Sequence, residues 1–171
     1  FVSDDEQIVV VQNGEIFNHV ELAEELEDSE FKCGTHCDTE VILRLYQKHG
    51  IDFVSKLNGM FAIAIWDNHQ KALYLIRDRV GEKPLHYFNE SNRVVFGSEI
   101  KSILAAGIDK KVDHNALDSF LSFNYVVPPS TMFKGVKHVM PGTYLKVTEQ
   151  KVEETRWWDI ADTELQVKTE D

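Results

Sequence analysis

The residues of this chain best suited to chemistry are Asn13 and Gly14, which follow one residue after an apolar, β-branched run at residues 8–11. Such a run is typical of a buried strand, so the residues at its end are held rigidly. An asparagine amide donates N–H, and a glycine, which lacks Cβ, lets a ligand approach its backbone N–H closely. Two convergent donors of this kind suit a developing oxyanion.

The same pair has a second interpretation, because Asn-Gly is also the strongest short signal for a two-residue β-hairpin turn. The residues after the pair do not resemble a second strand: Asn18 and Glu21 are spaced as in a capping box, and residues 21–28 are rich in helix formers. We therefore expect the strand to end at Asn13 and Gly14 and the chain to enter a helix, with the hairpin as the alternative.

A carboxylate, Asp38, precedes a second amphipathic stretch that ends at Gly50, a residue type common just after a helix. Its apolar residues share one helical face: Val41, Ile42, Leu45 and Tyr46. Asp38 suits the N-cap of this helix, where one carboxylate oxygen is used and the other stays free for a ligand.

The remaining elements must position these groups. Residues 60–67 and 72–78 are two strand-like runs joined by the polar loop 68–71, and they are expected to pair. Neither run alternates apolar with polar residues, so both faces need cover, while the predicted helices are few and amphipathic. The simplest arrangement packs sheet on sheet with helices outside, an α+β sandwich of four layers.

Further elements come later along the chain. Residues 93–97 form another expected strand, after which Ser98 can cap a short helix through Ala106 with Glu99 in its first turn. Asp113 can cap a further helix, and the strands 143–148 and 151–156 are expected to flank Gln150.

Composition limits the function. At 171 residues and 43% apolar content the chain fits one packed domain, or one domain and the start of a second. A formal net charge of −11 has the wrong sign for binding nucleic acid or an anionic membrane. The longest apolar run, residues 60–66, is far shorter than the roughly 20 residues that span a bilayer. We expect neither a nucleic-acid nor a membrane partner.

Cys33 and Cys37 flank His36, which suggests a zinc site, but no second pair of ligands at suitable spacing follows. We therefore expect no metal. Two cysteines in an acidic chain without a signal segment fit a reducing, cytoplasmic location better than a disulfide framework. The sequence opens at Phe1 and not at Met, so this expectation about location does not cover a targeting segment before Phe1.

Five segments, in this order along the chain, carry a family resemblance: NGEIFN at 13–18, CDTEVI at 37–42, LNGMFA at 57–62, RDRVGEKPL at 77–85 and GSEIK at 97–101. They resemble the class II glutamine amidotransferase domain of glutamine-hydrolysing asparagine synthetases, and the resemblance runs from about residue 8 to residue 158. It implies the N-terminal nucleophile hydrolase fold, a four-layer α/β/β/α sandwich.

The resemblance also implies roles. Asn13 and Gly14 would form the oxyanion hole, while Glu15 and Asp38 would position glutamine, Asp38 by pairing with its α-ammonium group. The family nucleophile is a cysteine at the mature N-terminus whose own α-amino group acts as base, and an upstream arginine holds the substrate carboxylate. Neither is in this chain, so we expect the chain alone to be inactive.

The implied reaction is hydrolysis of glutamine to supply ammonia for the ATP-dependent amidation of aspartate. Its partners are glutamine and a C-terminal synthetase domain, which would hold ATP and Mg²⁺; no cofactor is expected in this chain, and a homodimer stays open. Residues 1–125 would be the amidotransferase domain without its N-terminal segment, and residues 126–171 its end and a connector. The alternatives are the amidotransferase half of another ATP-dependent amide-forming enzyme and a non-catalytic binding domain of the same fold.

The turn after the second strand is densely charged. Its charged residues are Arg77, Asp78, Arg79, Glu82 and Lys83. Such a cluster is usually a solvated loop with weak ion pairs. In the family it lies near the glutamine pocket and the face toward the synthetase domain, so a supporting functional role is the alternative.

Overall fold

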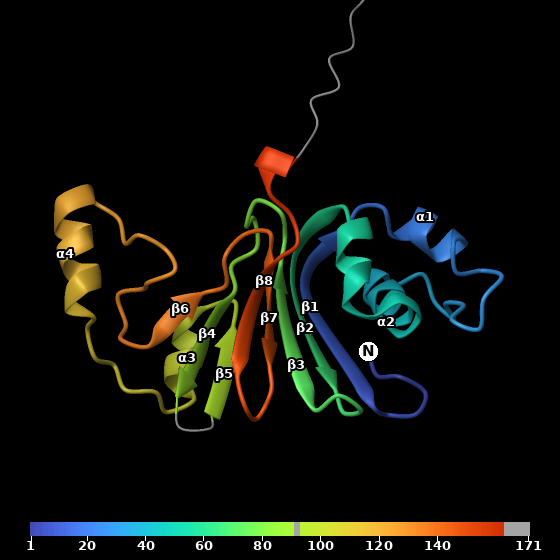
Figure 1. Ribbon diagram of the computed structural model, residues 1–171, viewed down its shortest axis with the longest axis horizontal. Coiled ribbons are helices and arrows are strands. Elements are labelled where there is room, and N and C mark those ends of the chain that lie inside the picture. Colours follow the sequence, from blue (N-terminus) through green and yellow to red (C-terminus); the bar gives the residue numbers. More distant parts are fainter. Residues whose placement is uncertain (91–92, 163–171) are drawn as a thin grey trace, which may run out of the picture.

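Two antiparallel sheets packed face to face form the centre of the structure, a computed structural model that describes residues 1–90 and 93–162 (Figure 1). The larger sheet has the order β1-β2-β3-β7-β8. Its strands are β1 (Ile8–Ile16), β2 (Gly59–Asp67), β3 (Ala72–Arg77), β7 (Thr143–Val147) and β8 (Val152–Arg156). The smaller sheet has the order β5-β4-β6, with β4 (His86–Glu90), β5 (Arg93–Gly97) and β6 (Val136–His138).

Helices cover the outer faces of both sheets, and a further helix stands away from them, as Figure 1 shows. The helices of the described residues are α1 (His19–Glu24), α2 (Asp38–His49), α3 (Ile100–Ala105) and α4 (His114–Phe123), with short 3-10 helices at Gly50–Lys56 and Ile160–Asp162. α1 and α2 lie against the larger sheet and α3 against the smaller one. None of the helices in the described part of the chain combines the length and the hydropathy needed to cross a membrane.

Three separate apolar layers hold this arrangement together. Between the larger sheet and its helices lie Val10, Leu22, Ile42, Phe53, Ile63 and other buried residues. Between the two sheets lie Ala62, Ala64, Leu75, Leu85, Val139, Leu145 and Val147. Beneath α3 lie Phe88, Ile103, Ile108 and Val136. Because β2 and β3 contribute to the layers on both of their faces, the expected four-layer sandwich is confirmed.

Strand β1 is longer than the sequence indicates. It continues through Asn13 and Gly14 to Ile16, with Asn13 opposite Ala62 and Gly14 opposite Phe61 of β2. The hairpin alternative and the expected end of the strand at this pair are therefore both wrong. Gly14 lets β1 continue beside β2 without a steric clash. Its φ is 139°, and a Cβ there would lie 2.0 Å from the carbonyl oxygen of Met60. Only glycine allows this approach.

The expected capping box at Asn18 is also wrong. Asn18 is the N-cap of α1 but makes no side-chain capping bond, and the helix ends at Glu24. Its amide instead ties this turn to the segment before β2, since Nδ2 donates to the Lys56 carbonyl (3.0 Å) and Oδ1 accepts from the Asn58 N–H (2.9 Å). A long-range partner has replaced the local one.

The predictions for the rest of the chain have mixed outcomes. β2 and β3 pair as expected, β7 and β8 flank Gln150, and the Asp113 side chain caps α4 by accepting from the N–H groups of Asn115 and Ala116. β4 and β6 were not foreseen. The expected connector, residues 126–171, extends beyond the described residues, and the proposed boundary at residue 125 stays a prediction.

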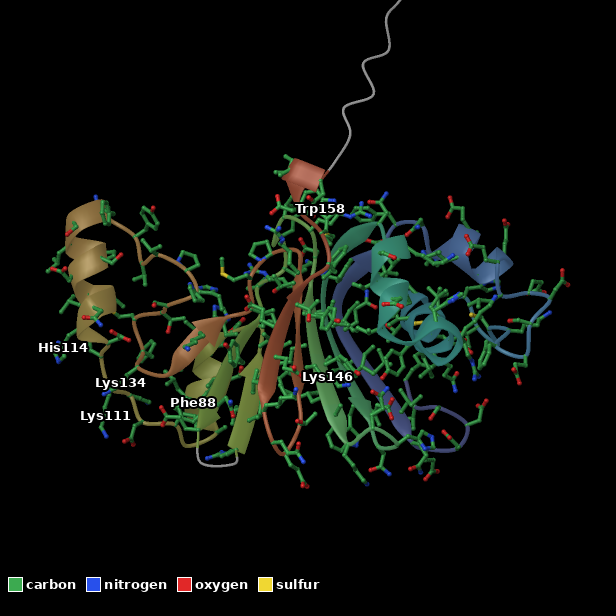
Figure 2. The ribbon with its side chains drawn as sticks, viewed as in Figure 1. Phe88, Lys111, His114, Lys134, Lys146 and Trp158 are labelled. Atoms are coloured by element: carbon green, nitrogen blue, oxygen red, sulfur yellow. The ribbon has the colours of Figure 1, made fainter. Side chains whose placement is uncertain are left out.

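Helix α4 stands apart from the two sheets in Figure 1, and Figure 2 labels its first residue, His114. Among its residues only Ala116 is buried. Phe120, Leu121 and Phe123 are exposed. The apolar side of this helix therefore has no cover within the described residues.

Candidate functional site

The outer edge of β1, the side away from β2, carries a free backbone donor. The N–H of Val10 donates outward to the Phe1 carbonyl (2.8 Å), and that of Ile16 donates outward to Asp38 Oδ2 (3.1 Å). Alternate residues of an antiparallel strand direct their N–H groups to the same side. Gly14 has the same parity, so its N–H also points outward, where no described residue accepts it.

The Asn13 side chain lies next to this donor and is turned toward the smaller sheet. Its Nδ2 donates to the hydroxyl of Ser98 at 2.8 Å. It also borders a small cavity of about 140 Å³ between the sheets. That cavity is lined by Val11, Gln12, Asn13, Ala62, Ile63, Ala64, Leu85, Phe96, Gly97 and Ser98. Because Nδ2 carries two hydrogens, one remains available for a ligand.

Ser98 does not have the role that the sequence suggested. The N-cap of α3 is Glu99, which is therefore not in the first turn, and no side chain caps this helix. The expected Ser98 cap is wrong because the hydroxyl is engaged by Asn13, a residue 85 positions earlier.

Asp38 is the first residue of α2, not its N-cap, and the expected cap is wrong. Cys37 takes the N-cap position without a side-chain capping bond. The Asp38 carboxylate turns back to β1 instead, where Oδ2 accepts from Gln12 Nε2 (2.9 Å) and from the Ile16 N–H (3.1 Å). Its other oxygen, Oδ1, has only a long contact of 3.4 Å to the Thr39 hydroxyl and a weak one to a thiol. That oxygen is available to a cation.

The four predicted site residues therefore all attach to one strand. Asn13 faces the smaller sheet, Asp38 approaches from the opposite, helical face, and Gly14 offers its N–H at the edge between them. Glu15 is exposed on the same strand and makes no side-chain hydrogen bond within the described residues. A ligand lying along this edge would meet a carboxylate at one end and two N–H donors at the other.

Gln12 is a residue that sequence reasoning missed. Its side chain links Asp38 to β1 and accepts from the Thr39 hydroxyl at 3.2 Å. The only signal for it is its place immediately before Asn13, with the side chain on the opposite face of the strand.

The charged turn after β3 is not a solvated loop. Asp78 is 1% exposed, and Arg77 donates to the carbonyl groups of Gly81, Lys83 and Val139. This turn joins the larger sheet to the smaller one, so its charges satisfy backbone groups where the chain changes sheets. The solvated-loop expectation is wrong for these two side chains, and the supporting functional role stays a prediction.

Behind the Ser98 segment lies a pair of histidines whose rings pack against each other at a tilt of 48°. His86 and His138 lie on neighbouring strands, and their ring centroids are 4.4 Å apart. His86 Nδ1 lies 3.1 Å from the Ser98 carbonyl oxygen. Burial lowers the pKa of His86, and burial with the neighbouring His86 and Arg77 lowers the pKa of His138 to about 4. Both rings are therefore neutral near pH 7.

We expect this pair to make the protein less stable in mild acid. The unfolded chain binds protons at these histidines below about pH 6.5. In the folded protein, His138 stays unprotonated until the pH falls to its lowered pKa of about 4. Stability is therefore full above pH 6.5 and is lost as the pH falls toward 4. In thermal melts, His138→Gln should lose less melting temperature between pH 7 and pH 4.5 than the unmodified protein. His114→Gln, at an exposed position, should behave like the unmodified protein, and equal losses in all three would contradict the prediction.

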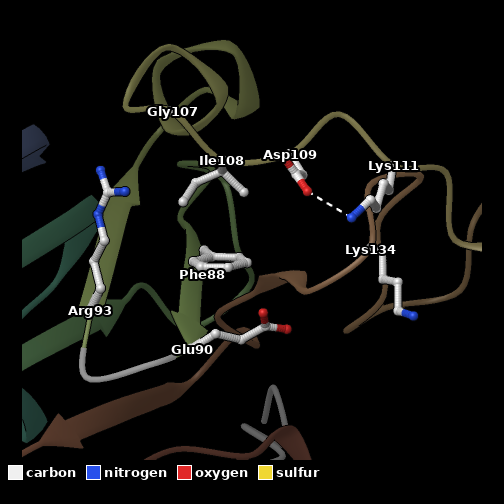
Figure 3. Close-up of a pocket in the computed structure, with 8 residues that line it drawn as sticks. All are labelled: Phe88, Glu90, Arg93, Gly107, Ile108, Asp109, Lys111 and Lys134. Atoms are coloured by element: carbon white, nitrogen blue, oxygen red, sulfur yellow. Dashed lines mark ion pairs between the residues drawn. The ribbon is translucent and has the colours of Figure 1, made fainter.

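A larger pocket lies elsewhere in the molecule (Figure 3). Its volume is about 490 Å³, and it is lined by Phe88, Glu90, Arg93, Gly107, Ile108, Asp109, Lys111 and Lys134. Asp109 and Lys111 form an ion pair of 2.7 Å at its rim. None of the predicted site residues borders it, and its lining residues include no cysteine, serine, threonine or histidine.

The two cysteines are free, half-buried thiols. Burial raises the pKa of Cys33, so a smaller fraction of this residue is the reactive thiolate. Within residues 1–90 and 93–162, no group of three His, Cys, Asp or Glu side chains lies close enough together to hold a metal ion. The absence of zinc stays a prediction, and elemental analysis of the purified protein would test it.

Comparison with known proteins places this geometry in a family. The glutamine amidotransferase domain family matches residues 1–158. Glutamine-hydrolysing asparagine synthetase 1 of Bacillus subtilis is 42% identical over 144 residues, which are 84% of this chain and 23% of that protein. The putative glutamine-hydrolysing asparagine synthetase 2 of Methanocaldococcus jannaschii is 34% identical over 164 residues, 93% of this chain and 31% of that protein. The chain thus spans less than a third of the length of either relative, 23% of the first and 31% of the second.

A solved structure confirms the fold. Glutamine phosphoribosylpyrophosphate amidotransferase of Bacillus subtilis, complexed with ADP and GMP, superposes with a TM-score of 0.66 at 20% identity, over 92% of this chain and 31% of that one. At this identity the likeness concerns the fold alone, and it supports the α+β sandwich of the N-terminal nucleophile hydrolase type. With a family match over residues 1–158, the chain belongs to the glutamine amidotransferase domain family.

Proposed function

We propose that this chain is the glutaminase part of a longer, glutamine-dependent asparagine synthetase. The observation that carries the proposal is the outward N–H of Gly14 beside the Asn13 amide at the open edge of β1. In the full-length protein a cysteine thiolate, supplied from before Phe1, attacks the side-chain amide carbon of glutamine. The carbonyl oxygen becomes an oxyanion, which accepts hydrogen bonds from both donors.

The remaining steps follow from this attack. The tetrahedral intermediate collapses, the C–N bond breaks and the protonated nitrogen leaves as ammonia, which leaves a thioester on the cysteine. Water then attacks the thioester and releases glutamate and the thiol. Ammonia passes to an aspartate that ATP has activated with Mg²⁺, in a synthetase domain outside this chain.

Free thiols in the chain fit a cytoplasmic location.

Asp38 and Glu15 position glutamine in this proposal. The free Oδ1 of Asp38 pairs with the α-ammonium group of the substrate, while Oδ2 remains on Gln12 and the Ile16 N–H. This pairing is present in the ground state and in the transition state alike. It therefore affects binding more than the rate of the chemical step.

Asp38→Asn in the full-length protein should raise the Michaelis constant for glutamine about 10- to 100-fold, with little change in kcat. The substitution removes a charge-assisted hydrogen bond, commonly about 1.5–3 kcal/mol, but keeps an oxygen for the Ile16 N–H. The measurement is steady-state glutamate release, with Asp52→Asn, at an exposed position, as the matched control. An unchanged Michaelis constant would remove Asp38 from the substrate site.

The proposal is tested with glutamine labelled with ¹⁵N at the side-chain amide. The full-length protein, given ATP, Mg²⁺ and aspartate, should release glutamate and place the label in asparagine. The 171-residue chain alone should release no glutamate. Label in a different amide product would favour another ATP-dependent amide-forming enzyme, and binding of glutamine without hydrolysis would favour a non-catalytic domain. Turnover by the chain alone that Cys33→Ser or Cys37→Ser abolishes would overturn the assignment of the nucleophile.

A further inference from the structure

One hydrogen bond within the described residues fixes the orientation of the Asn13 side-chain amide. The residue is exposed on the open edge of β1, and its side chain makes a single hydrogen bond within the described residues, from Nδ2 to Ser98 Oγ at 2.8 Å. An asparagine amide otherwise rotates readily about χ2 and can exchange the places of its oxygen and nitrogen. An oxyanion donor works best when it is already aimed before the reaction starts.

Ser98 is well placed to orient the Asn13 amide, because the backbone of Ser98 is fixed by its neighbours. It follows β5 directly, and its carbonyl oxygen lies 3.1 Å from Nδ1 of His86, which is 7% exposed. His86 lies opposite Gly97 in the strand register and is packed against His138. Since burial lowers the pKa of His86, the ring is neutral near pH 7 and can keep its proton on the nitrogen that faces Ser98.

The contact also crosses between the sheets. Asn13 belongs to the larger sheet and Ser98 to the end of an edge strand of the smaller one, 85 residues further along the chain. The relative position of the two sheets therefore determines where the Asn13 amide points. With one hydrogen of Nδ2 held by Ser98, the second is directed away from that hydroxyl, because the two N–H bonds lie about 120° apart in one plane.

We propose that Ser98 is a positioning residue for the glutaminase reaction: its hydroxyl, carried on a backbone that the smaller sheet holds, orients the Asn13 amide so that the second Nδ2 hydrogen meets the oxyanion. The inference rests on the proposed function and adds to it a residue that touches neither glutamine nor the nucleophile. Ser98 acts through Asn13 alone, so its effect must disappear when the Asn13 amide is absent.

The first test uses single variants of the full-length protein and steady-state glutamate release. Ser98→Ala should lower kcat about five- to tenfold, the effect of one neutral hydrogen bond, and leave the Michaelis constant for glutamine nearly unchanged. Ser98→Thr keeps the hydroxyl and should restore most of the rate. Ser102→Ala is the matched control, since this serine lies four residues further on, in α3, and within the described residues its hydroxyl bonds to the Glu99 carbonyl and not to Asn13. Its rate should equal that of the unmodified protein.

The second test is a double-mutant cycle. Adding Ser98→Ala to Asn13→Ala should cause no further loss of kcat, whereas a general structural role would lower the rate equally in both backgrounds. A thermal melt of each variant checks that it is folded. An unchanged kcat in Ser98→Ala, or the same loss with and without the Asn13 amide, would overturn this inference and leave the proposed function intact. Absence of glutamate release by the unmodified full-length protein would overturn both.

Discussion

Asn13→Ala in the full-length protein should lower kcat for glutamine hydrolysis by about 10²- to 10³-fold, the usual cost of deleting one preorganised oxyanion donor. The Michaelis constant should change little, because the ground-state carbonyl gains less from this donor than the oxyanion does. The structure separates this effect from folding. Asn13 is exposed, and its only side-chain partner among the described residues is the Ser98 hydroxyl, so the variant should melt close to the unmodified protein.

A matched control is available for this prediction. Asn89 is also an exposed asparagine in a strand, but it lies on β4 in the smaller sheet, away from the edge of β1. Asn89→Ala should leave kcat unchanged. A folded Asn13→Ala protein with an unmodified rate constant would remove Asn13 from the oxyanion hole, and the open edge at Gly14 would be left with one donor.

Elements with local sequence signals were predictable, and elements set by distant partners were not. The β2–β3 pair was predictable because its apolar runs and polar loop are local signals. β1 was predicted too short, because Asn and Gly are disfavoured in strands and local propensity indicates a break. Pairing with Phe61 and Ala62 of β2, nearly fifty residues away, outweighs that preference. β6 spans only Val136–His138, too short to show a period.

The sequence indicates which residues belong to the candidate site, but not what they contact. Asn13, Gly14 and Asp38 were proposed from their types and from the family motifs, and their roles stay a prediction. Asp38 and Ser98 both looked like helix caps, since each stands just before a helix-forming segment. In the structure each side chain instead contacts β1, across 26 and 85 residues respectively. Polar residues at helix starts are ambiguous in this way, because a side chain that caps can equally bond to a distant strand.

Asp78→Ala should cause the largest loss of stability, about 3–5 kcal/mol in the free energy of unfolding measured with urea. The Asp78 carboxylate is 1% exposed and accepts hydrogen bonds from five backbone N–H groups. The donors belong to Phe61, Val80, Gly81, Glu82 and Lys83. Removing the carboxylate leaves these donors without their acceptor in a partly buried turn, and each unsatisfied group costs about 1–3 kcal/mol unless water reaches it.

The consequence extends to the candidate site, because one of those donors is Phe61, the residue opposite Gly14 in the register of β1 and β2. Losing Asp78 should therefore loosen the strand against which Gly14 is aligned, and Asp78→Asn, which keeps one carbonyl acceptor, should lose less stability. Glu82→Ala is the control, since its exposed side chain lies on the same turn and should change stability by less than about 0.5 kcal/mol. If Asp78→Ala also stayed within about 1 kcal/mol of the unmodified protein, water would already be replacing the carboxylate, and the turn would not be the feature that fixes β2 beside Gly14.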